Sequence, residues 1–430
     1  MRLLGTRRGK RMLQHRVVDM ALVSITVALV LVIALGSLLP RAGMPGPAHA
    51  QSPQTLKYTG AASCGASNCH GATKPKPDYP RLNENILWMQ KDKHAKAFAT
   101  LTNEKLKSGV RPSKIVKELK IANAEASDRC LICHAVNVPA PLRASKFDIT
   151  EGVHCDGCHG PAEKWLEPHA EKGWTHEQSV KVGMYDTKNF LLRAEKCVAC
   201  HLKIDQELVA AGHPDLVAFE LDTFSANMPP HWRDKGTWIG TKTWATGQVI
   251  ALREAAKQLG ERAKANASPT LLEDALKKVR GHGAMVRHFL DITAPEQSKA
   301  LQQDVAAVTE AVGKDDKGGI GSASGKIVAA TQQLAPAAAS REYDLAIAQK
   351  LIQAIAGDGE GIGGTGIRAA EQGAMALDRL YNTYSKSPGH KADKAASDAL
   401  DKVFNDIQDP SKYDGKRFAA DVKEFLANFK

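Results

Sequence analysis

The spacing of the cysteines constrains this chain of 430 residues more than any other feature. All eight cysteines form pairs between residues 64 and 200, and a histidine directly follows the second cysteine of each pair. Two residues separate the cysteines in three of the pairs, and four residues separate them in the first pair. In chain order the motifs are Cys64-Gly-Ala-Ser-Asn-Cys69-His70, Cys130-Leu-Ile-Cys133-His134, Cys155-Asp-Gly-Cys158-His159 and Cys197-Val-Ala-Cys200-His201.

The Cys-x-x-Cys-His pattern predicts covalent attachment of haem c. Two thiols add to the vinyl groups on one edge of a porphyrin, and the adjacent imidazole becomes an axial ligand of the iron. Zinc ribbons and thioredoxin-like motifs also pair cysteines, but neither needs a histidine after every pair. A disulfide framework, common in exported chains, has no use for these histidines either. We therefore predict four haem groups. For the wider first motif, a local disulfide beside an incidental histidine is the alternative.

The first 50 residues predict export. A basic stretch precedes an apolar run from Val17 to Leu39, and Ala48-His-Ala50 forms a small-x-small cleavage site, as in a secretory signal peptide. The apolar run is also long enough to remain as a membrane anchor. We predict a periplasmic protein, cleaved after Ala50 or anchored to the inner membrane. This segment carries +6 of the formal charge of +11, so the remaining chain gives no reason to expect a nucleic-acid partner.

Further histidines are available as second axial ligands. His94 follows a helix-like stretch, and His169, His213 and His231 lie near prolines or glycines that would present a side chain rigidly. We predict these four as iron ligands opposite the motif histidines. The reserves are His154 and His176, whereas surface or core positions are expected for His282, His288 and His390.

Residues 58–232 resemble the tetrahaem cytochrome c-554 family. The matching segments are Tyr58-Thr-Gly, His94-Ala-Lys-Ala, Gly152-Val-His-Cys155-Asp-Gly-Cys-His159-Gly-Pro161, Glu195-Lys-Cys197-Val-Ala-Cys-His201-Leu, Ala210-Ala-Gly-His213-Pro and Met228-Pro-Pro-His231-Trp. The resemblance implies stacked haem pairs, mostly ligated by two histidines, that carry electrons between redox partners. It implies that His94 ligates a haem of a later motif, that His169 ligates another haem, and that the His213–His231 region reaches back to the first. In the narrow c-554 type, the haem corresponding to His134 lacks a distal ligand. The chain departs from the family in its wider first motif, in His154 and in its long C-terminal extension.

The C-terminal half contains no cysteine and has a helical apolar periodicity from about Trp244 onward. Val249, Leu252, Ala256 and Leu259 mark one stripe, and Ser268-Pro269 predicts the start of the next helix. Further helices are expected at 295–312, 322–335, 342–356, 367–385, 392–407 and 415–429. The predicted fold is mainly α, with a haem domain at 51–243 that has little regular sheet and a helical bundle at 244–430.

Glycine-rich segments at 317–321 and 361–366 are expected to separate helices. The second of these, Gly361-Ile-Gly-Gly-Thr-Gly366, matches the dinucleotide-binding fingerprint, but the residues before it favour a helix rather than the required strand. Residues 321–326 resemble a phosphate loop that is one residue too short. We therefore predict no nucleotide site.

Electron transfer between partner proteins is the predicted function, because irons with two histidine ligands offer no vacant position to a substrate. One alternative is a haem enzyme that acts on nitric oxide, nitrite or hydroxylamine at a five-coordinate iron on His134. The other is a structural role for the helical half, with the haems incidental.

Mass spectrometry of the mature chain tests the haem count. We expect the mass of a chain that begins at Gln51 plus four haem groups, because each cysteine pair takes up one porphyrin. A mass with three haem groups would mean that Cys64 and Cys69 have another role.

Overall fold

The computed structural model describes residues 55–215 and 218–429. Over these residues the chain forms eighteen α-helices, α2 to α19, and no strand; extended backbone pairs only at an isolated parallel bridge between Tyr58 and Arg143. The prediction of a mainly α fold is therefore confirmed. The predicted signal peptide lies outside the described residues. Within them, no helix combines the length and apolarity needed to cross a membrane.

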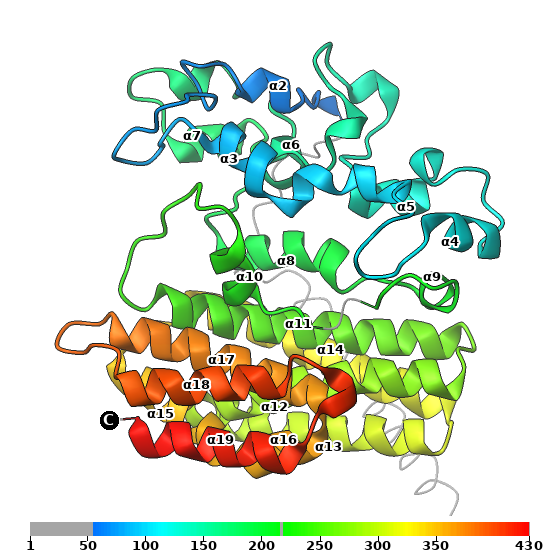
Figure 1. Cartoon of the computed structure of the whole chain (residues 1–430), viewed down its shortest axis with the longest axis vertical. Coiled ribbons are helices and arrows are strands. Elements are labelled where there is room, and N and C mark those ends of the chain that lie inside the picture. The colour runs from blue at the N-terminus through cyan, green and yellow to red at the C-terminus, as the bar shows by residue number, and fades with distance from the viewer. Residues whose placement is uncertain (1–54, 216–217, 430) are drawn as a thin grey trace, which may run out of the picture. The chain divides into compact units, whose positions relative to one another are not determined.

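The cysteine-bearing part consists of short helices and 3₁₀ turns joined by loops (Figure 1). Local capping defines several of these helices: Thr175 and Gln178 form a capping box on α7, and the Asn189 side chain accepts from the first backbone N–H groups of α8. The separate apolar cluster of this part is small, with Leu101, Leu131 and two alanines as its buried members. Its helices are α2 (Ala61–Cys64), α3 (Glu84–Lys91), α4 (Pro112–Glu118), α5 (Asp128–His134), α6 (Cys155–His159), α7 (His176–Lys181), α8 (Phe190–His201), α9 (Gln206–Ala210) and α10 (Leu221–Asn227).

Longer helices form the C-terminal bundle. The predicted stripe lies on its first helix, and Val249, Leu252 and Leu259 are completely buried there. Ser268 caps the next helix with Pro269 at its first position, as expected. The bundle comprises α11 (Ile239–Lys264), α12 (Pro269–Thr293), α13 (Pro295–Gly313), α14 (Lys317–Ser340), α15 (Leu345–Gly357), α16 (Gly359–Thr365), α17 (Ile367–Ser385), α18 (Lys394–Asp406) and α19 (Gly415–Asn428).

Two segments that we expected to separate helices are themselves helical. Residues 317–321 form the first turns of α14, where Asp316 accepts from the Gly319 N–H at 2.9 Å and Ile320 is fully buried. Residues 359–365 form α16, which packs against α19. A Cβ atom on Gly363 would lie 2.5 Å from the carbonyl oxygen of Gly415, so this contact requires glycine. Tertiary packing thus outweighs the low helix propensity of glycine at both places.

The apolar core continues from the bundle into the haem-motif region. Val198 and Leu202, at the end of α8, belong to the same buried cluster as the bundle helices, together with Phe219 and Leu221. Glu195 of α8 also accepts a two-pronged ion pair from Arg253 of α11, with one N–O distance of 2.6 Å. The described residues, 55–215 and 218–429, belong to one compact unit. Residue 243, where the sequence predicts a domain boundary, lies inside α11.

Replacing Leu252 with alanine tests the packing of α11. Because Leu252 is fully buried, we expect the free energy of unfolding to fall by about 2–5 kcal/mol. Chemical denaturation followed by far-ultraviolet circular dichroism measures this change. Lys257→Ala, at an exposed position of the same helix, should change stability by less than about 0.5 kcal/mol. Equal losses in both variants would contradict this assignment of the core.

Candidate haem sites

The three Cys-x-x-Cys-His motifs lie at or near helix ends. His134 is the last residue of α5, His159 the last of α6 and His201 the last of α8. One turn of helix thus holds both thiols and the imidazole of each motif close together. All eight cysteines are free thiols in the structure.

The wider first motif is closed by a tight loop. Cys64 ends α2, and the N–H of His70 donates to the Cys64 carbonyl at 3.0 Å. Gly71 then passes so close to Gly65 that a Cβ on Gly71 would lie 1.9 Å from the Gly65 carbonyl oxygen. The four residues between the cysteines therefore form a compact loop. This loop keeps His70 close to Cys64 despite the longer spacing of the first motif.

Three motif histidines each face a histidine from a distant segment. The ring centres are 6.1 Å apart for His70 and His169, 6.1 Å for His94 and His201, and 6.2 Å for His134 and His213. The first pair of rings is nearly parallel at 4°, and the other two are nearly perpendicular at 82° and 87°. A first-row metal lies about 2 Å from an imidazole nitrogen, so two rings on opposite sides of one ion have centres roughly 6 Å apart. The observed spacing fits an iron between each pair.

The Nδ1 atoms of five of these six histidines, and that of His231, face hydrogen-bond acceptors. On the motif side, His70 faces Glu84 Oε2 at 2.9 Å, and His134 faces the Ala97 carbonyl at 2.9 Å. Opposite them, His94 faces Asp92 Oδ1 at 2.9 Å and His213 faces the Pro214 carbonyl at 2.8 Å. His169 and His231 face the backbone carbonyls of Leu166 and Pro229, at 2.6 and 2.9 Å. Nδ1 then carries the proton, and Nε2 is left free to bind a metal.

The histidine of the third motif, His159, is half-buried. Burial lowers its pKa to about 4, and a positive charge on His231 is the largest of the nearby histidine contributions that lower it further. Burial also lowers the pKa of His201 to about 4 and depresses that of His134. These rings are neutral at physiological pH, as a metal ligand must be.

Thiols of different motifs meet in two places. A hydrogen bond with Cys200, together with burial, raises the pKa of the Cys133 thiol. A hydrogen bond with Cys64, together with burial, raises that of Cys155. The second motif therefore lies against the fourth, and the first lies against the third.

The remaining histidines are not paired in this way. His154 is buried beside Phe147, with neither ring nitrogen hydrogen-bonded, and His176 uses Nε2 to bond Asp186 at 2.8 Å. His282 and His288 are buried in the bundle and bond Gln248 and Asp358, and His390 lies against Tyr384. Over the described residues, no three His, Cys, Asp or Glu side chains gather as a separate metal cluster would require.

The ring contacts differ from the resemblance in which histidine faces the first motif. His169, rather than the His213–His231 region, faces the first motif. His213 faces His134, which the narrow c-554 pattern would leave without a distal partner. His94 faces His201 of the fourth motif.

Sequence reasoning missed the residues that orient these rings. Glu84 accepts from the backbone of Arg81 and Leu82 as well as facing His70, and Asp92 caps the turn that carries His94. An aspartate two residues before a histidine was a visible signal for Asp92. Glu84 lies fourteen residues from His70, and only the fold brings the two together.

A helical fold with repeated cysteine-pair motifs and imidazoles at iron-binding separation defines a c-type cytochrome that binds haem c covalently. In agreement with this class, residues 63–160 match the family model described as cytochrome c554 and c-prime, which confirms the predicted resemblance over that segment. The match includes the first three motifs, whereas Cys197, His169, His213 and His231 lie beyond it. No curated protein and no solved structure matches the chain.

Glu220, which lies eleven residues before His231 in the chain, makes a pH-dependent contribution to the free energy of unfolding. It caps α10, the helix that leads to His231, by accepting from the N–H groups of Asp222 and Thr223 at 2.8 and 2.7 Å. Burial, and then the negative charge of Asp222, raises its pKa to about 7. Between pH 4.5 and about 7, the Glu220 carboxyl therefore keeps its proton in the folded protein, whereas the same group has lost its proton in the unfolded chain.

We expect the free energy of unfolding to fall as the pH rises from the ordinary glutamate pKa of 4.5 to about 7, because only the folded state still binds this proton there. Glu220→Gln should remove up to about 3 kcal/mol of that fall. Urea denaturation at about pH 5 and about pH 8 measures the difference. The exposed Glu360→Gln should keep the wild-type dependence, and an unchanged slope in Glu220→Gln would contradict the assignment.

Proposed function

We propose that this protein is a periplasmic tetrahaem c-type cytochrome that passes electrons between redox partner proteins. The observation that carries the proposal is the spacing of 6.1–6.2 Å between the paired imidazoles of three sites. When bound, each haem supplies an iron that takes up and releases one electron. The chain supplies the thiols that attach the haems and the histidines that close each iron from both faces.

The proposed ligand set follows from the pairs in the structure. His70 and His169 serve the first haem, His134 and His213 the second, His159 and His231 the third, and His201 and His94 the fourth. The first, second and fourth pairs rest on ring contacts. The third pair joins the remaining motif histidine, His159, to His231, the remaining histidine of the four that the sequence predicts as ligands. Two histidine ligands keep reduction potentials below those of methionine-ligated haem, since methionine raises them.

Contacts between motifs support movement of electrons along the chain of sites. Cys133 lies beside Cys200 and Cys64 beside Cys155, so the attachment edges of two pairs of sites are neighbours. Attached haems would therefore lie in two close pairs, the first with the third and the second with the fourth. This arrangement suits a carrier that receives an electron at one surface and delivers it at another.

The cellular location in this proposal rests on the first 50 residues. Their basic, apolar and small-x-small parts are those of an export signal, and haem attachment requires free thiols in the exported chain. Removing this segment leaves a formal charge of +5, which the haem propionates would reduce further. Redox proteins are the partners that suit such a surface.

A haem enzyme acting on a small nitrogen oxide or hydroxylamine would need an open iron. The second motif was the best candidate for it, and the ring of His213 lies 6.2 Å from the ring of His134 at that position. This geometry favours the electron carrier over the enzyme.

Carbon monoxide tests the proposal, because it binds reduced haem only where an axial position is free. We expect an entirely low-spin spectrum and no carbon monoxide shift in the wild type. His94→Gly, His169→Gly and His213→Gly should each create a carbon monoxide shift that amounts to one haem in four, since each removes one ligand.

The matched control is His176→Gln, because the Nε2 atom of His176 bonds Asp186 and not a metal. This variant should bind no carbon monoxide. A shift of one haem in four in the wild type would instead support the enzyme with an open iron.

A further inference from the structure

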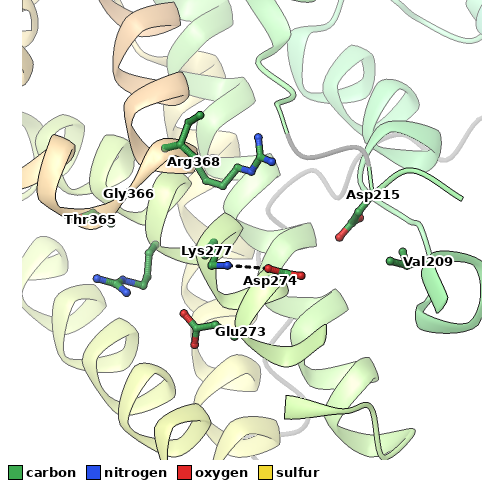
Figure 2. Close-up of a pocket in the computed structure, with 10 residues that line it drawn as sticks. Val209, Asp215, Glu273, Asp274, Lys277, Thr365, Gly366 and Arg368 are labelled. Carbon is green, nitrogen blue, oxygen red and sulfur yellow. Dashed lines mark hydrogen bonds and ion pairs between the residues drawn. The ribbon is translucent and has the colours of Figure 1, made fainter. Parts of the chain in front are cut away.

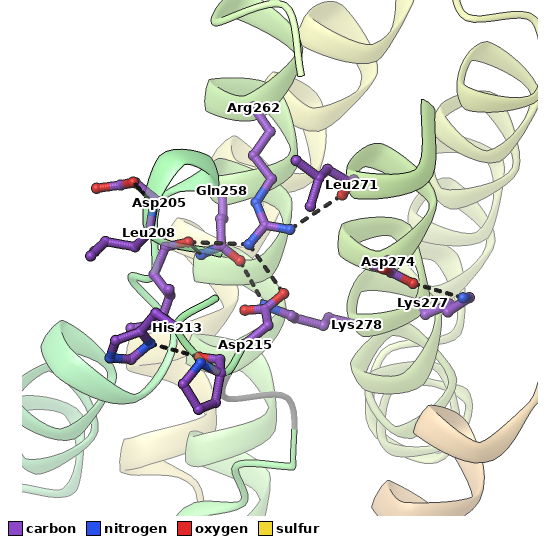
Figure 3. Close-up of polar contacts among 12 residues, drawn as sticks. Asp205, Leu208, His213, Asp215, Gln258, Arg262, Leu271, Asp274, Lys277 and Lys278 are labelled. Carbon is purple, nitrogen blue, oxygen red and sulfur yellow. Dashed lines mark hydrogen bonds and ion pairs between the residues drawn. The ribbon is translucent and has the colours of Figure 1, made fainter. Parts of the chain in front are cut away.

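A buried cluster of charges joins the loop that carries His213 to the helical bundle (Figure 3). Asp215, two residues after His213, accepts from Lys278 Nζ at 2.6 Å and from Arg262 Nη2 at 3.1 Å. Arg262 belongs to α11 and Lys278 to α12. One carboxylate from the haem-binding part therefore meets two cations from two bundle helices. We call these three residues the Asp215 clamp.

Both cations of the Asp215 clamp are almost completely buried. Arg262 and Lys278 are each only 2% exposed, although these residue types are rarely buried without a partner. Asp215 is the carboxylate that pairs with both of them. Because an uncompensated buried charge is strongly unfavourable, the two cations hold Asp215, and the backbone attached to it, in one position.

Neutral groups also accept hydrogen bonds from both cations. Lys278 Nζ also donates to Gln258 Oε1 at 2.9 Å. Arg262 also donates to the carbonyls of Leu271 and Ile204, at 3.2 and 3.1 Å. Ile204 follows the fourth motif closely in the chain, so the same cluster also holds the segment after His201. Buried networks of hydrogen-bonded charges restrict the movement of the groups they contain.

The short path from Asp215 to His213 transmits this rigidity to the imidazole. Pro214 lies between them and restricts the backbone, and its carbonyl is the group that the His213 Nδ1 atom faces at 2.8 Å. The N–H of His213 donates to the Leu208 carbonyl at 2.9 Å, which ties the other side of the residue to α9. The contacts with the Pro214 and Leu208 carbonyls thereby fix the orientation of the His213 ring toward His134.

The second anchor of this loop lies on the haem motif itself. Arg129, next to Cys130 in α5, pairs with Asp205 at 2.6 Å and with Glu207 at 2.9 Å. These carboxylates flank the start of α9, so the segment 205–215 is attached to the second motif at one end and to the bundle at the other. The exposed pair at Arg129 contributes less than the buried Asp215 clamp, because solvent screens it.

We propose that Asp215 is a positioning residue, held by Arg262 and Lys278, that keeps His213 on the iron of the second haem and so keeps this haem closed. The inference rests on the proposed ligation of that haem by His134 and His213. It assigns a role to the C-terminal helices: they supply the fixed end against which a distal ligand is held.

A neighbouring ion pair provides a matched control. Beside the clamp, a cavity of about 420 Å³ is lined by Asp215 and by Asp274 and Lys277 of α12, among others (Figure 2). Lys277 and Asp274 pair at 2.8 Å, and their side chains are 45% and 46% exposed. This pair has the same chemistry on the same helix as Lys278, but its bond joins two residues of α12 and does not reach the His213 loop.

Carbon monoxide binding to the full-length reduced protein, with all its haems attached, tests the proposal. We expect Asp215→Asn to raise the carbon monoxide-reactive fraction from none toward one haem in four, while far-ultraviolet circular dichroism keeps the helical signal. Lys278→Met, which leaves the Asp215–Arg262 pair in place, should give a smaller rise in the same direction. Lys277→Met and Asp274→Asn should behave as the wild type. Free imidazole should restore the low-spin spectrum of Asp215→Asn, because it can occupy the position that His213 has left.

The outcomes separate this inference from the proposed function. Carbon monoxide binding by the wild type would refute the proposed closure of all four irons. A closed wild type together with a folded Asp215→Asn that stays closed would overturn the role of Asp215 alone. If Asp215→Asn does not fold, Lys278→Met decides: a rise in the reactive fraction above that of Lys277→Met supports the Asp215 clamp, and equal fractions overturn it.

Discussion

The opposition of two imidazoles is the constraint on which the rest of the structure depends. In each of the three ring pairs, one histidine belongs to a cysteine motif and the other comes from a distant part of the chain. The smallest separation in sequence is the 79 residues between His134 and His213. The two rings must approach to about 6 Å and present their Nε2 atoms. Local helix formation can supply the first ring of a pair but cannot supply the second. The loops between the motifs therefore have to be held by contacts that act over long distances in the sequence.

Different parts of the molecule meet this demand by different means. Glu84 and Asp92 orient rings through carboxylates, whereas Ala97, Leu166, Pro214 and Pro229 do so through backbone carbonyls. A backbone acceptor needs no particular side chain, so most of these contacts leave no trace in the sequence. The bundle adds a third means, in which buried charges on α11 and α12 fix a loop that carries a ligand.

The sequence predicted the helices of the bundle well because their signals are local. The apolar stripe of α11, the Ser268-Pro269 start of α12 and the later helices depend on periodicity and capping within one segment. The helical glycine-rich segments were missed, since the contacts of Ile320 and Gly363 that favour helix there involve distant residues. For the same reason, the motif residues and their candidate partners could be named from the sequence, but the pairing of His169 with His70 and of His213 with His134 could not. The distances that decide it exist only in the folded chain.

The continuous core has a consequence for how the two halves of this chain can be separated. Val198, Leu202, Phe219 and Leu221 lie on the haem-bearing side of residue 243, yet they are buried in one cluster with the bundle helices. A fragment that stopped before α11 would expose this apolar face to water and would lose the partner of Glu195 at the same time. Such a fragment would be prone to aggregate. The bundle helices thus cover an apolar face of the haem-bearing part. We therefore expect that a gene encoding only the four motifs would not yield a soluble protein.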